Sequence, residues 1–400
     1  MTDALRILYH HRIRADDGQA VHVRELIAAL RLAGHAVQEC ALVPKTGAGQ
    51  APAAVATQAA VGRPGFWQRL QLPRAAVEVL EILYNGKGRA MLRAAARQQP
   101  PHCIYERHAL HCRAGLDVAR QLDVPLLLEV NSPMVDEMQQ LGSLRFERRA
   151  RATERHVLGN ADAVLAVTAV LGDMLVERGA RRERVHVIGN GAVPERYGAA
   201  ARAAAPALRQ HLGLGEAAFA LAFVGYMRPW HRLDLVLEAM LRPELASLVL
   251  VLMGRGPALV ALQAQAQQLG LSARVKVLGE VPAELIPAHL FACDAALIPA
   301  INAYASPLKL FDSLAAGVPT LAPDQPNLRE SIVHGENGLL FQPGDLADLA
   351  AQLTTLVKDR AFARRLGDAG ARTLHERRWT WAGNAERVAA IARALGRGAR

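Results

Sequence analysis

The feature that most constrains the fold is an alternation of short apolar strands and helical segments, which runs through the chain twice. In the first run, an apolar strand at 5–9 is followed by helically spaced apolar residues at 23–30 and by a second strand at 36–43. Four more strand-like segments follow, at 103–105, 125–130, 163–167 and 185–188. Because helices between successive strands return the chain in the same direction, this alternation predicts a parallel sheet covered by helices.

The pattern restarts after an alanine-rich stretch at 196–206, whose low complexity predicts a linker. The strands expected beyond it lie at 218–224, 248–252, 275–278, 295–298 and 320–322, and a largely helical stretch covers 346–395. With 400 residues the chain is long for one core. We therefore expect an α/β protein with two doubly wound, Rossmann-like domains at 1–200 and 201–380, and a last helix at about 381–400. Within the first domain, we predict a loop at 44–65 and two helices at 66–99, broken at 85–88.

The charge and composition of the chain restrict its partners and its setting. Lys and Arg outnumber Asp and Glu by 47 to 37, and the net charge of +10 suits nucleic acid, an anionic membrane surface or an acidic substrate. Aromatic residues are only 4%, which leaves few stacking platforms, so we expect no nucleic-acid partner. The four cysteines are scattered without zinc spacing, acidic residues come early, and no apolar run is long enough for a spanning helix. These observations predict a cytoplasmic protein.

The stretch 306–341 combines a helix start with polar side chains. Ser306 is suited to cap a helix and Pro307 to begin it, and the apolar residues from Leu308 onward recur at helical spacing until Gly317 ends the helix. The unpaired N–H groups and positive dipole of a helix N-terminus suit a diphosphate. Asp312 follows just past the first turn of this helix, close enough to meet a group that the phosphates carry.

This stretch reads SPLKLFDSLAAGVPTLAPDQPNLRESIVHGENGLLF. It resembles the nucleotide-sugar site of retaining family 4 glycosyltransferases (glycosyl transferases group 1), whose pattern runs roughly SPLK-L-F-E-x-x-A-x-G-x-P-V, then a Glu, then H-G-x-N-G-L-L. Asp312 matches the second acid of the family's pair, and Tyr304 stands where the first acid is usual. The resemblance implies ribose binding by Asp312. It also implies the GT-B fold, with two domains facing across a cleft and the last helix packed on the first domain.

A second motif is FVGYMRPWHRLD at 223–234, which resembles the family's strand–turn–helix that supplies basic side chains to the diphosphate. Gly225 ends the strand, and Arg228 and His231 stand at or near the basic positions, while Arg232 replaces a usual glycine. Lys309 is another cation expected on the same side. Charged donors of this kind stabilise a departing diphosphate. The alternative is that Arg228 and Lys309 are solvated surface cations.

The remaining candidates are less strongly supported by local pattern. Gly18, with Gln19 beside it, lies in a polar loop at the carboxyl end of a strand, where doubly wound sheets bind ligands. Glu330 matches a Glu common in the family, or it caps a helix at 331–334. Two motifs, YERHALHCRAG at 105–115 and LEVNSP at 128–133, resemble family sequences. They mark acceptor-side candidates at Glu106, Arg107, His108, Glu129 and Asn131. A lone histidine such as His108 is also common as a structural residue.

From the resemblance we expect a retaining enzyme that moves a hexose-type sugar from a UDP- or GDP-linked donor to a glycan, lipid-linked or small-molecule acceptor. The resemblance also implies transfer without a metal or other cofactor, and the absence of a metal-chelating D-x-D motif from the sequence agrees with this expectation. Two alternatives stay open: a nucleotide-sugar 2-epimerase-like enzyme on the same fold, and a basic binding protein without catalysis. A basic helix at 144–158 and the segment FWQRL at 66–70 also suggest contact with an anionic membrane, against the alternative of a solvated helix face.

Overall fold

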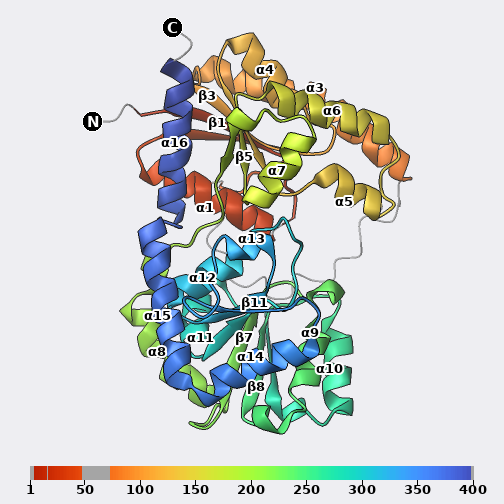
Figure 1. Ribbon diagram of the computed structural model, residues 1–400. Helices are drawn as coiled ribbons and strands as arrows, with labels where there is room; N and C mark the ends of the chain where they lie inside the picture. The colour runs from red at the N-terminus through yellow and green to blue at the C-terminus, as the bar shows by residue number, and fades with distance from the viewer. Residues whose placement is uncertain (1–3, 16, 47–72, 398–400) are drawn as a thin grey trace, which may run out of the picture. The chain divides into compact units, whose positions relative to one another are not determined.

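The computed structural model describes residues 4–15, 17–46 and 73–397, which form two compact units (Figure 1). Unit 1 comprises Met1–Gly189 and Trp381–Arg400, and unit 2 comprises Asn190–Thr380. The boundary thus lies between Gly189 and Asn190, upstream of the boundary predicted at residue 200. In the described part of the chain, no helix is both long and apolar enough to cross a membrane.

Unit 1 is built on a six-stranded sheet in the order β2-β1-β3-β4-β5-β6, in which all neighbouring strands are parallel. The strands are β1 (Arg6–His11), β2 (Ala36–Ala41), β3 (Cys103–Arg107), β4 (Leu126–Val130), β5 (Ala163–Ala166) and β6 (Val185–Val187). The helices are α1 (Gly18–Leu32), α3 (Arg74–Gln98), α4 (Ala114–Leu122), α5 (Met134–Gln140), α6 (Glu147–Asn160), α7 (Ala169–Glu177) and α16 (Trp381–Arg397). Strand order reverses between β1 and β3, which makes the carboxyl ends of these two strands the topological switch point.

Unit 2 repeats this architecture with the order β12-β11-β10-β7-β8-β9, again with parallel neighbours. Its strands are β7 (Phe219–Val224), β8 (Leu248–Met253), β9 (Val275–Gly279), β10 (Ala295–Leu297), β11 (Thr320–Pro323) and β12 (Leu339–Phe341). Its helices are α8 (Ala199–His211), α9 (Leu233–Ala239), α10 (Leu259–Gln268), α11 (Ile286–Phe291), α12 (Leu308–Ala316), α13 (Pro326–Arg329), α14 (Leu346–Lys358) and α15 (Arg360–Arg377). Here the switch point lies between β7 and β10. The predicted pair of parallel sheets is confirmed.

Three neighbouring strands in each sheet are buried along their whole length. Every residue of β3, β4 and β5 is buried, and so is every residue of β10, β11 and β12. Parallel strands covered by helices on two sides lose contact with water in this way, which explains their near-continuous apolar sequences. The largest core cluster joins Phe219, Phe223 and Leu250 of the second sheet to apolar residues of α9 and α14.

The last helix, α16, packs against α1 within unit 1 (Figure 1). The rings of Trp381 and His22 meet edge to face with centroids 4.9 Å apart. Asn384 donates a hydrogen bond from its side chain to the carbonyl of Gly189, at 2.8 Å. In unit 2, the N–H of Ala192 donates to the carbonyl of Trp379, at 3.1 Å. The chain therefore leaves unit 1 and returns to it at neighbouring points.

Two predictions of local structure are wrong, one at 196–206 and one at 85–88. The predicted linker at 196–206 is mostly helix α8. Alanine has the highest helix propensity, and the helix packs on α11. The Arg202 guanidinium of α8 lies 4.3 Å from the centre of the Phe291 ring of α11.

The predicted break at 85–88 does not exist, because α3 runs through these residues. Asn85 donates to the carbonyl of His111 at 2.8 Å, and a Cβ atom at Gly88 would lie 2.9 Å from Cβ of Ala114. Asn85 and Gly88 therefore do not form a turn. They contact the segment 111–114, which leads into α4. The segment FWQRL and most of the predicted loop at 44–65 lie outside the described residues.

Candidate functional site

The carboxyl edge of the second sheet, around the switch point, gathers most of the predicted site residues of unit 2. Gly225 directly follows β7, and Arg228 and His231 lie in the turn between β7 and α9. The chain beyond β10 leads through Ser306 and Pro307 into α12, which carries Lys309 and Asp312. Open α/β sheets bind ligands at this position because both loops diverge there and leave room between them.

The loops after β7 and β8 lie in backbone-to-backbone contact. The N–H of Gly225 donates to the carbonyl of Met253 at 2.9 Å, and the N–H of Met227 donates to that of Arg255 at 2.7 Å. Gly225, Gly254 and Gly256 have φ of +132°, +137° and +155°, a region that other residues rarely adopt. A Cβ atom at Gly254 would lie 2.1 Å from the carbonyl oxygen of Gly225, which only glycine avoids. Gly254 and Gly256 were not predicted as site residues, although two glycines just after a buried strand are a signal for such a close approach.

Lys309 is a half-buried lysine at the same edge of the sheet. Its Nζ lies 4.0 Å from the centre of the Phe223 ring and 3.4 Å from where a Cβ atom of Gly225 would be. In the part of the chain that the structure describes, no carboxylate forms an ion pair with it. Desolvation by burial lowers the pKa of Lys309 to about 7. A cation withdrawn from water in this way is stabilised by an incoming anion.

His231 is a neutral hydrogen-bond donor at the same edge. Its Nδ1 accepts a hydrogen bond from the N–H of Arg228, at 3.1 Å, which leaves its proton on Nε2. Burial lowers the pKa of His231 to about 3, and the charges of Lys309 and Arg228 act in the same direction. The ring packs against Phe223, with centroids 5.3 Å apart. Arg228 itself is exposed, with its guanidinium 5.0 Å from the centre of the Tyr226 ring. The two predicted cations thus lie close enough to His231 for their charges to act on its ring.

Helix α12 begins differently from the sequence prediction. Pro307 is the N-cap, without a side-chain capping bond, and Leu308 is the first helical residue, so the assignment of Ser306 as the cap and Pro307 as the first residue is wrong. The Ser306 hydroxyl instead accepts a hydrogen bond from the N–H of Asn190 at 3.2 Å, and Asn190 donates from its side chain to the Ser306 carbonyl at 2.5 Å. The loop before α12 is thus held by the segment through which the chain enters unit 2.

Asp312 and Glu330 have surroundings that the sequence did not indicate. Asp312 is half-buried and accepts a hydrogen bond from the hydroxyl of Tyr197, at 2.8 Å, so the partner that its burial requires is supplied in part by the protein. Glu330 is exposed and follows α13 as its C-cap. No helix forms at 331–334, because the side chain of Asn337 bonds to the N–H of Val333 and holds a turn there. The capping role considered for Glu330 is therefore wrong.

In unit 1, the carboxylate of Glu129 lies at the centre of a buried polar network. It accepts from the hydroxyls of Tyr105 at 2.7 Å and Tyr9 at 3.2 Å, pairs with His22 at 3.1 Å, and is contacted by Arg107 and Asn131. Burial by itself raises the pKa of Glu129, but the charges of His22 and Arg107 and the hydrogen bonds outweigh it and bring the pKa well below its usual value. Glu129 is 2% exposed. The network orients Arg107 and Asn131, two of the acceptor-side candidates.

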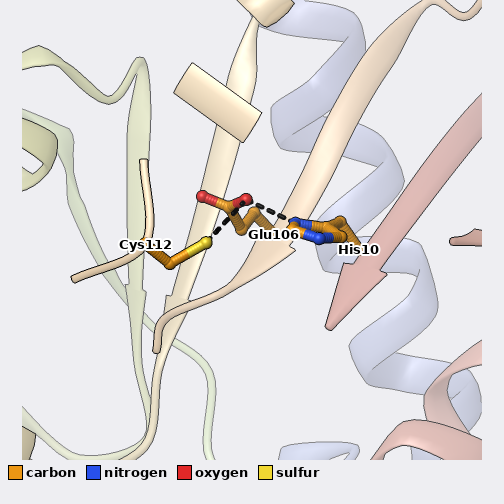
Figure 2. Close-up of side chains that lie close together, drawn as sticks. All are labelled: His10, Glu106 and Cys112. Carbon is orange, nitrogen blue, oxygen red and sulfur yellow. Dashed lines mark hydrogen bonds and ion pairs between the residues drawn. The ribbon is translucent and has the colours of Figure 1, made fainter. Parts of the chain in front are cut away.

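A second buried cluster joins β1, β3 and the start of α4 (Figure 2). The Glu106 carboxylate meets His10 Nδ1 at 2.5 Å and Cys112 Sγ at 3.8 Å, and accepts from the N–H of Gly115 at 2.7 Å. His10, Glu106 and Cys112 are ligand types that a metal ion such as zinc accepts, and their atoms lie within 4.8 Å of one another. However, one carboxylate oxygen already takes all three contacts, and burial together with the Glu106 charge raises the pKa of the Cys112 thiol, which keeps it protonated. The cluster is better suited to brace α4 against the sheet.

The other predicted residues of unit 1 lie at the carboxyl ends of β1 and β3. His108 follows β3 and is buried, with Nδ1 lacking a hydrogen-bond partner, and burial lowers its pKa to about 4 although Glu106 opposes the shift. Gly18 is the first residue of α1. Asp17 is the N-cap, and its side chain accepts from the N–H of Gln19 at 3.0 Å. The carboxylate at this helix start makes it a poor place for a phosphate, so Gly18 and Gln19 are weaker candidates than their position in the loop indicated.

Comparison with known proteins agrees with this geometry. The model of the family "Glycosyl transferases group 1" matches residues 204–373, and the "Glycosyl transferase 4-like domain" matches residues 17–191. The chain belongs to the group 1 glycosyltransferases. It is 30% identical over 308 residues to a D-inositol 3-phosphate glycosyltransferase of Geodermatophilus obscurus, a match that covers 73% of this chain and 66% of that protein. A second protein of that name, from Nocardia farcinica, is 33% identical over 205 residues, or 49% of this chain and 44% of its own length. The chain thus spans about two thirds or less of these relatives.

Solved structures share the fold of this group 1 member. Sucrose-phosphate synthase from Thermosynechococcus elongatus superposes with a TM-score of 0.77 at 21% identity, covering 98% of this chain and 99% of that one. The Anabaena protein HepE in complex with UDP-glucose gives a TM-score of 0.67 at 18% identity, over 98% of this chain and 100% of that one. The fold is therefore GT-B, as the sequence resemblance implied.

Proposed function

We propose that this protein is a retaining, metal-independent glycosyltransferase that moves a hexose-type sugar from a nucleotide-sugar donor to a hydroxyl acceptor. The observation that carries the proposal is the half-buried side chain of Lys309, which has no acidic partner among the described residues and lies beside the glycines of the loops after β7 and β8. A diphosphate is the ligand that matches this edge, because it needs positive charge and close backbone approach at the same place. The structurally similar protein HepE was solved in complex with UDP-glucose, so a UDP-linked donor is the first to test.

In the proposed reaction, the bond between the anomeric carbon and the diphosphate breaks while a bond to the acceptor oxygen forms on the same face of the sugar. A phosphate oxygen of the donor takes the proton of the acceptor hydroxyl, so no protein base is needed. Arg228, Lys309 and the Nε2–H of His231 stabilise the negative charge that develops on the departing diphosphate. These cationic and donor groups take the part that a divalent metal plays elsewhere. Asp312 binds the ribose.

Unit 1 supplies the acceptor side in this proposal. His108 is neutral at physiological pH, buried, and has a ring nitrogen free to bond a sugar or acceptor hydroxyl. The acceptor itself is a glycan, a lipid-linked glycan or a small polyol. The relative that acts on an inositol phosphate favours testing a phosphorylated polyol first.

The function is tested by donor binding and by transfer. A thermal-shift screen with UDP, GDP and ADP selects the base, and release of the nucleotide from the matching sugar donor measures turnover in the presence and absence of EDTA. Arg228→Ala and Asp312→Ala are each expected to reduce turnover by about a hundredfold or more while the melting temperature stays close to that of the wild type. Full activity in both variants would show that the site is elsewhere, and formation of an epimer of the donor sugar would favour the epimerase alternative.

We also propose that the region around the start of α6 contacts an anionic membrane surface, which would bring the protein to a lipid-linked acceptor. Arg145, Arg148 and Arg149 at the start of α6 are exposed, as are Leu141 and Phe146 next to them. Arg151 is instead paired with Glu147 at 2.8 Å and Asp136 at 3.1 Å, so only part of the predicted basic face is available. Flotation with anionic vesicles at low and high salt tests the contact, and binding that depends on neither charge nor salt contradicts it.

A further inference from the structure

Helices α3, α4 and α6 lie in unit 1 (Figure 1). Residues of these three helices and of the loop before α4 line a groove of about 660 Å³. None of the residues assigned above to sugar transfer lines it. Four arginines line it, Arg89 and Arg93 from α3, Arg113 just before α4, and Arg120 from α4, against the single carboxylate of Asp117. We call this set of four arginines and its cavity the arginine groove. Its lining is strongly positive.

The arginines differ in how their charge is balanced. Arg89 and Arg113 both pair with Asp117, with nitrogen-to-oxygen distances of 2.7 Å and 2.9 Å. Arg93 instead bonds to the side-chain oxygen of Gln121 at 2.9 Å, and Arg120 to the carbonyl of Asn160 at 2.8 Å. These two partners are neutral. They hold each guanidinium in place and leave its charge and its other N–H groups available to the groove.

Some exposed arginines elsewhere on the described surface each pair with an acid of their own. Arg182 pairs with Asp173, Arg329 with Asp324, and Arg255 with Glu280. The arginine groove differs from these pairs, because it brings four guanidiniums to one concave surface with one acid among them. Like charges gathered on one concave surface repel one another, and an anion bound there would relieve the repulsion.

We propose that the arginine groove binds a phosphate ester, at a site separate from the one for the nucleotide-sugar donor. Guanidinium groups match phosphate oxygens with paired N–H donors, which favours phosphate over a carboxylate or a halide. The volume is too large for a phosphate alone, so the ligand carries an organic body. Two sources share this chemistry: the headgroup of a phosphate-bearing lipid, and a soluble phosphorylated sugar or polyol.

The first test measures binding of glycerol 3-phosphate by calorimetry and of phosphatidylcholine vesicles with and without phosphatidic acid by flotation. The double variant Arg93→Gln/Arg120→Gln is expected to bind the probe at least about tenfold more weakly than the wild type, because each lost charge-assisted bond is strong. The control Arg97→Gln/Arg364→Gln removes the same charge from exposed arginines outside the groove. We expect it to bind within about twofold of the wild type, with the weak dependence that net charge alone produces. Circular dichroism verifies that both variants are folded.

A second variant changes binding in the opposite direction. Asp117→Asn removes the acid that occupies Arg89 and Arg113, and it should tighten binding of the phosphate probe several-fold. A residue with a purely structural role would not give this gain. Lys309 lies in the proposed donor site, and Lys309→Ala should leave the binding of glycerol 3-phosphate to the groove unchanged. The proposal for the groove can therefore fail without the proposal for the donor site, and the reverse also holds.

The two probes distinguish the sources of the ligand. Binding to phosphatidic-acid vesicles that is lost in the groove variant assigns a lipid headgroup, and binding of the soluble ester alone assigns a free phosphorylated metabolite. The proposal is overturned if neither probe binds, or if the double variant and its control bind either probe equally well.

Discussion

At the scale of single residues, Lys309 and Glu129 show two opposite ways of holding a charge away from water. Lys309 has no acidic partner in the described structure, and burial lowers its pKa to about 7. Glu129 has five donors around it, and its pKa lies below the usual value despite burial. The charged form of Lys309 therefore lowers the stability of the free protein, whereas the hydrogen bonds and charges around Glu129 contribute to the stability of unit 1.

Replacing Lys309 by methionine should stabilise the free protein. The folded-state pKa of about 7 lies below the ordinary value of 10.5, so the unfolded chain binds more protons between these pH values. The free energy of unfolding of the wild type should therefore rise with pH across this interval. Lys309→Met should be more stable by about 1–2 kcal/mol at neutral pH and below, and this advantage should shrink towards pH 10. Urea unfolding at pH 6.5 and 9.5 measures the difference. An advantage that does not change with pH would contradict the low pKa.

Replacing Glu129 by glutamine should destabilise unit 1. Arg107 would be left buried without its acid, a loss of about 3–5 kcal/mol in the free energy of unfolding. Because the folded pKa of Glu129 is depressed, its contribution is complete above the unfolded pKa and is lost as pH falls through the folded pKa. The difference between wild type and Glu129→Gln should thus be large at pH 7 and decrease in acid. A difference that persists unchanged at low pH would show that packing, and not charge, is responsible.

At the scale of elements, the loops after β7 and β8 form one unit through their backbones. Three glycines with positive φ and two interloop hydrogen bonds hold the turn that carries Arg228 and His231. Main-chain contacts therefore fix the backbone of this edge of the sheet before any ligand binds.

The alanine variant at Gly254 tests this coupling. The new Cβ atom would lie 2.1 Å from the carbonyl oxygen of Gly225, so the two loops must separate. We expect donor binding to weaken by about tenfold or more and the unfolding free energy to fall by about 2–3 kcal/mol. The matched control is Gly213→Ala, where φ is +66° and no atom lies within 4 Å, so that backbone strain alone acts. Equal effects of the two variants would rule out contact between the loops as the cause.

At the scale of the whole molecule, the chain forms two similar six-stranded parallel sheets, and its last helix belongs to the unit in which the chain begins. Trp381, Ala385, Val388 and Ala392 of α16 are buried in unit 1. The fold of unit 1 thus needs both ends of the sequence, while unit 2 is continuous.

Deleting residues 381–400 should affect the two units differently. The loss of buried apolar surface on α1 should reduce the stability of unit 1 by more than about 3 kcal/mol, since burying one large apolar side chain contributes about 1.5–3 kcal/mol. Amide hydrogen exchange should become faster in α1 and β1, while β7, β8 and β10 of unit 2 keep their protection. Faster exchange in both units would indicate that they unfold as one cooperative body.

The sequence by itself determined the strands, their parallel arrangement and the family, because these depend on local properties. Apolar runs of four to six residues separated by helical periods specify a buried parallel sheet wherever they occur. The stretch 306–341 and the motif 223–234 carried the resemblance because their chemistry is contained in short segments. Local pattern was misleading where a residue acts over distance: Asn85 and Gly88 look like a turn, but they serve the contact of α3 with the start of α4.

Only the tertiary structure decided the environment of each candidate. Tyr197 reaches Asp312 across 115 positions, Asn190 holds Ser306 across 116, and Glu129 meets Tyr9 across 120. The order of strands brings these pairs together, and no local spacing encodes that order. The same holds for the desolvation of Lys309 beside Phe223, and for the four guanidiniums of the arginine groove, which come from separate helices and the loop before α4. Charge and burial are properties of the folded surroundings, so the chemistry of the site became readable only when the strands and helices were in place.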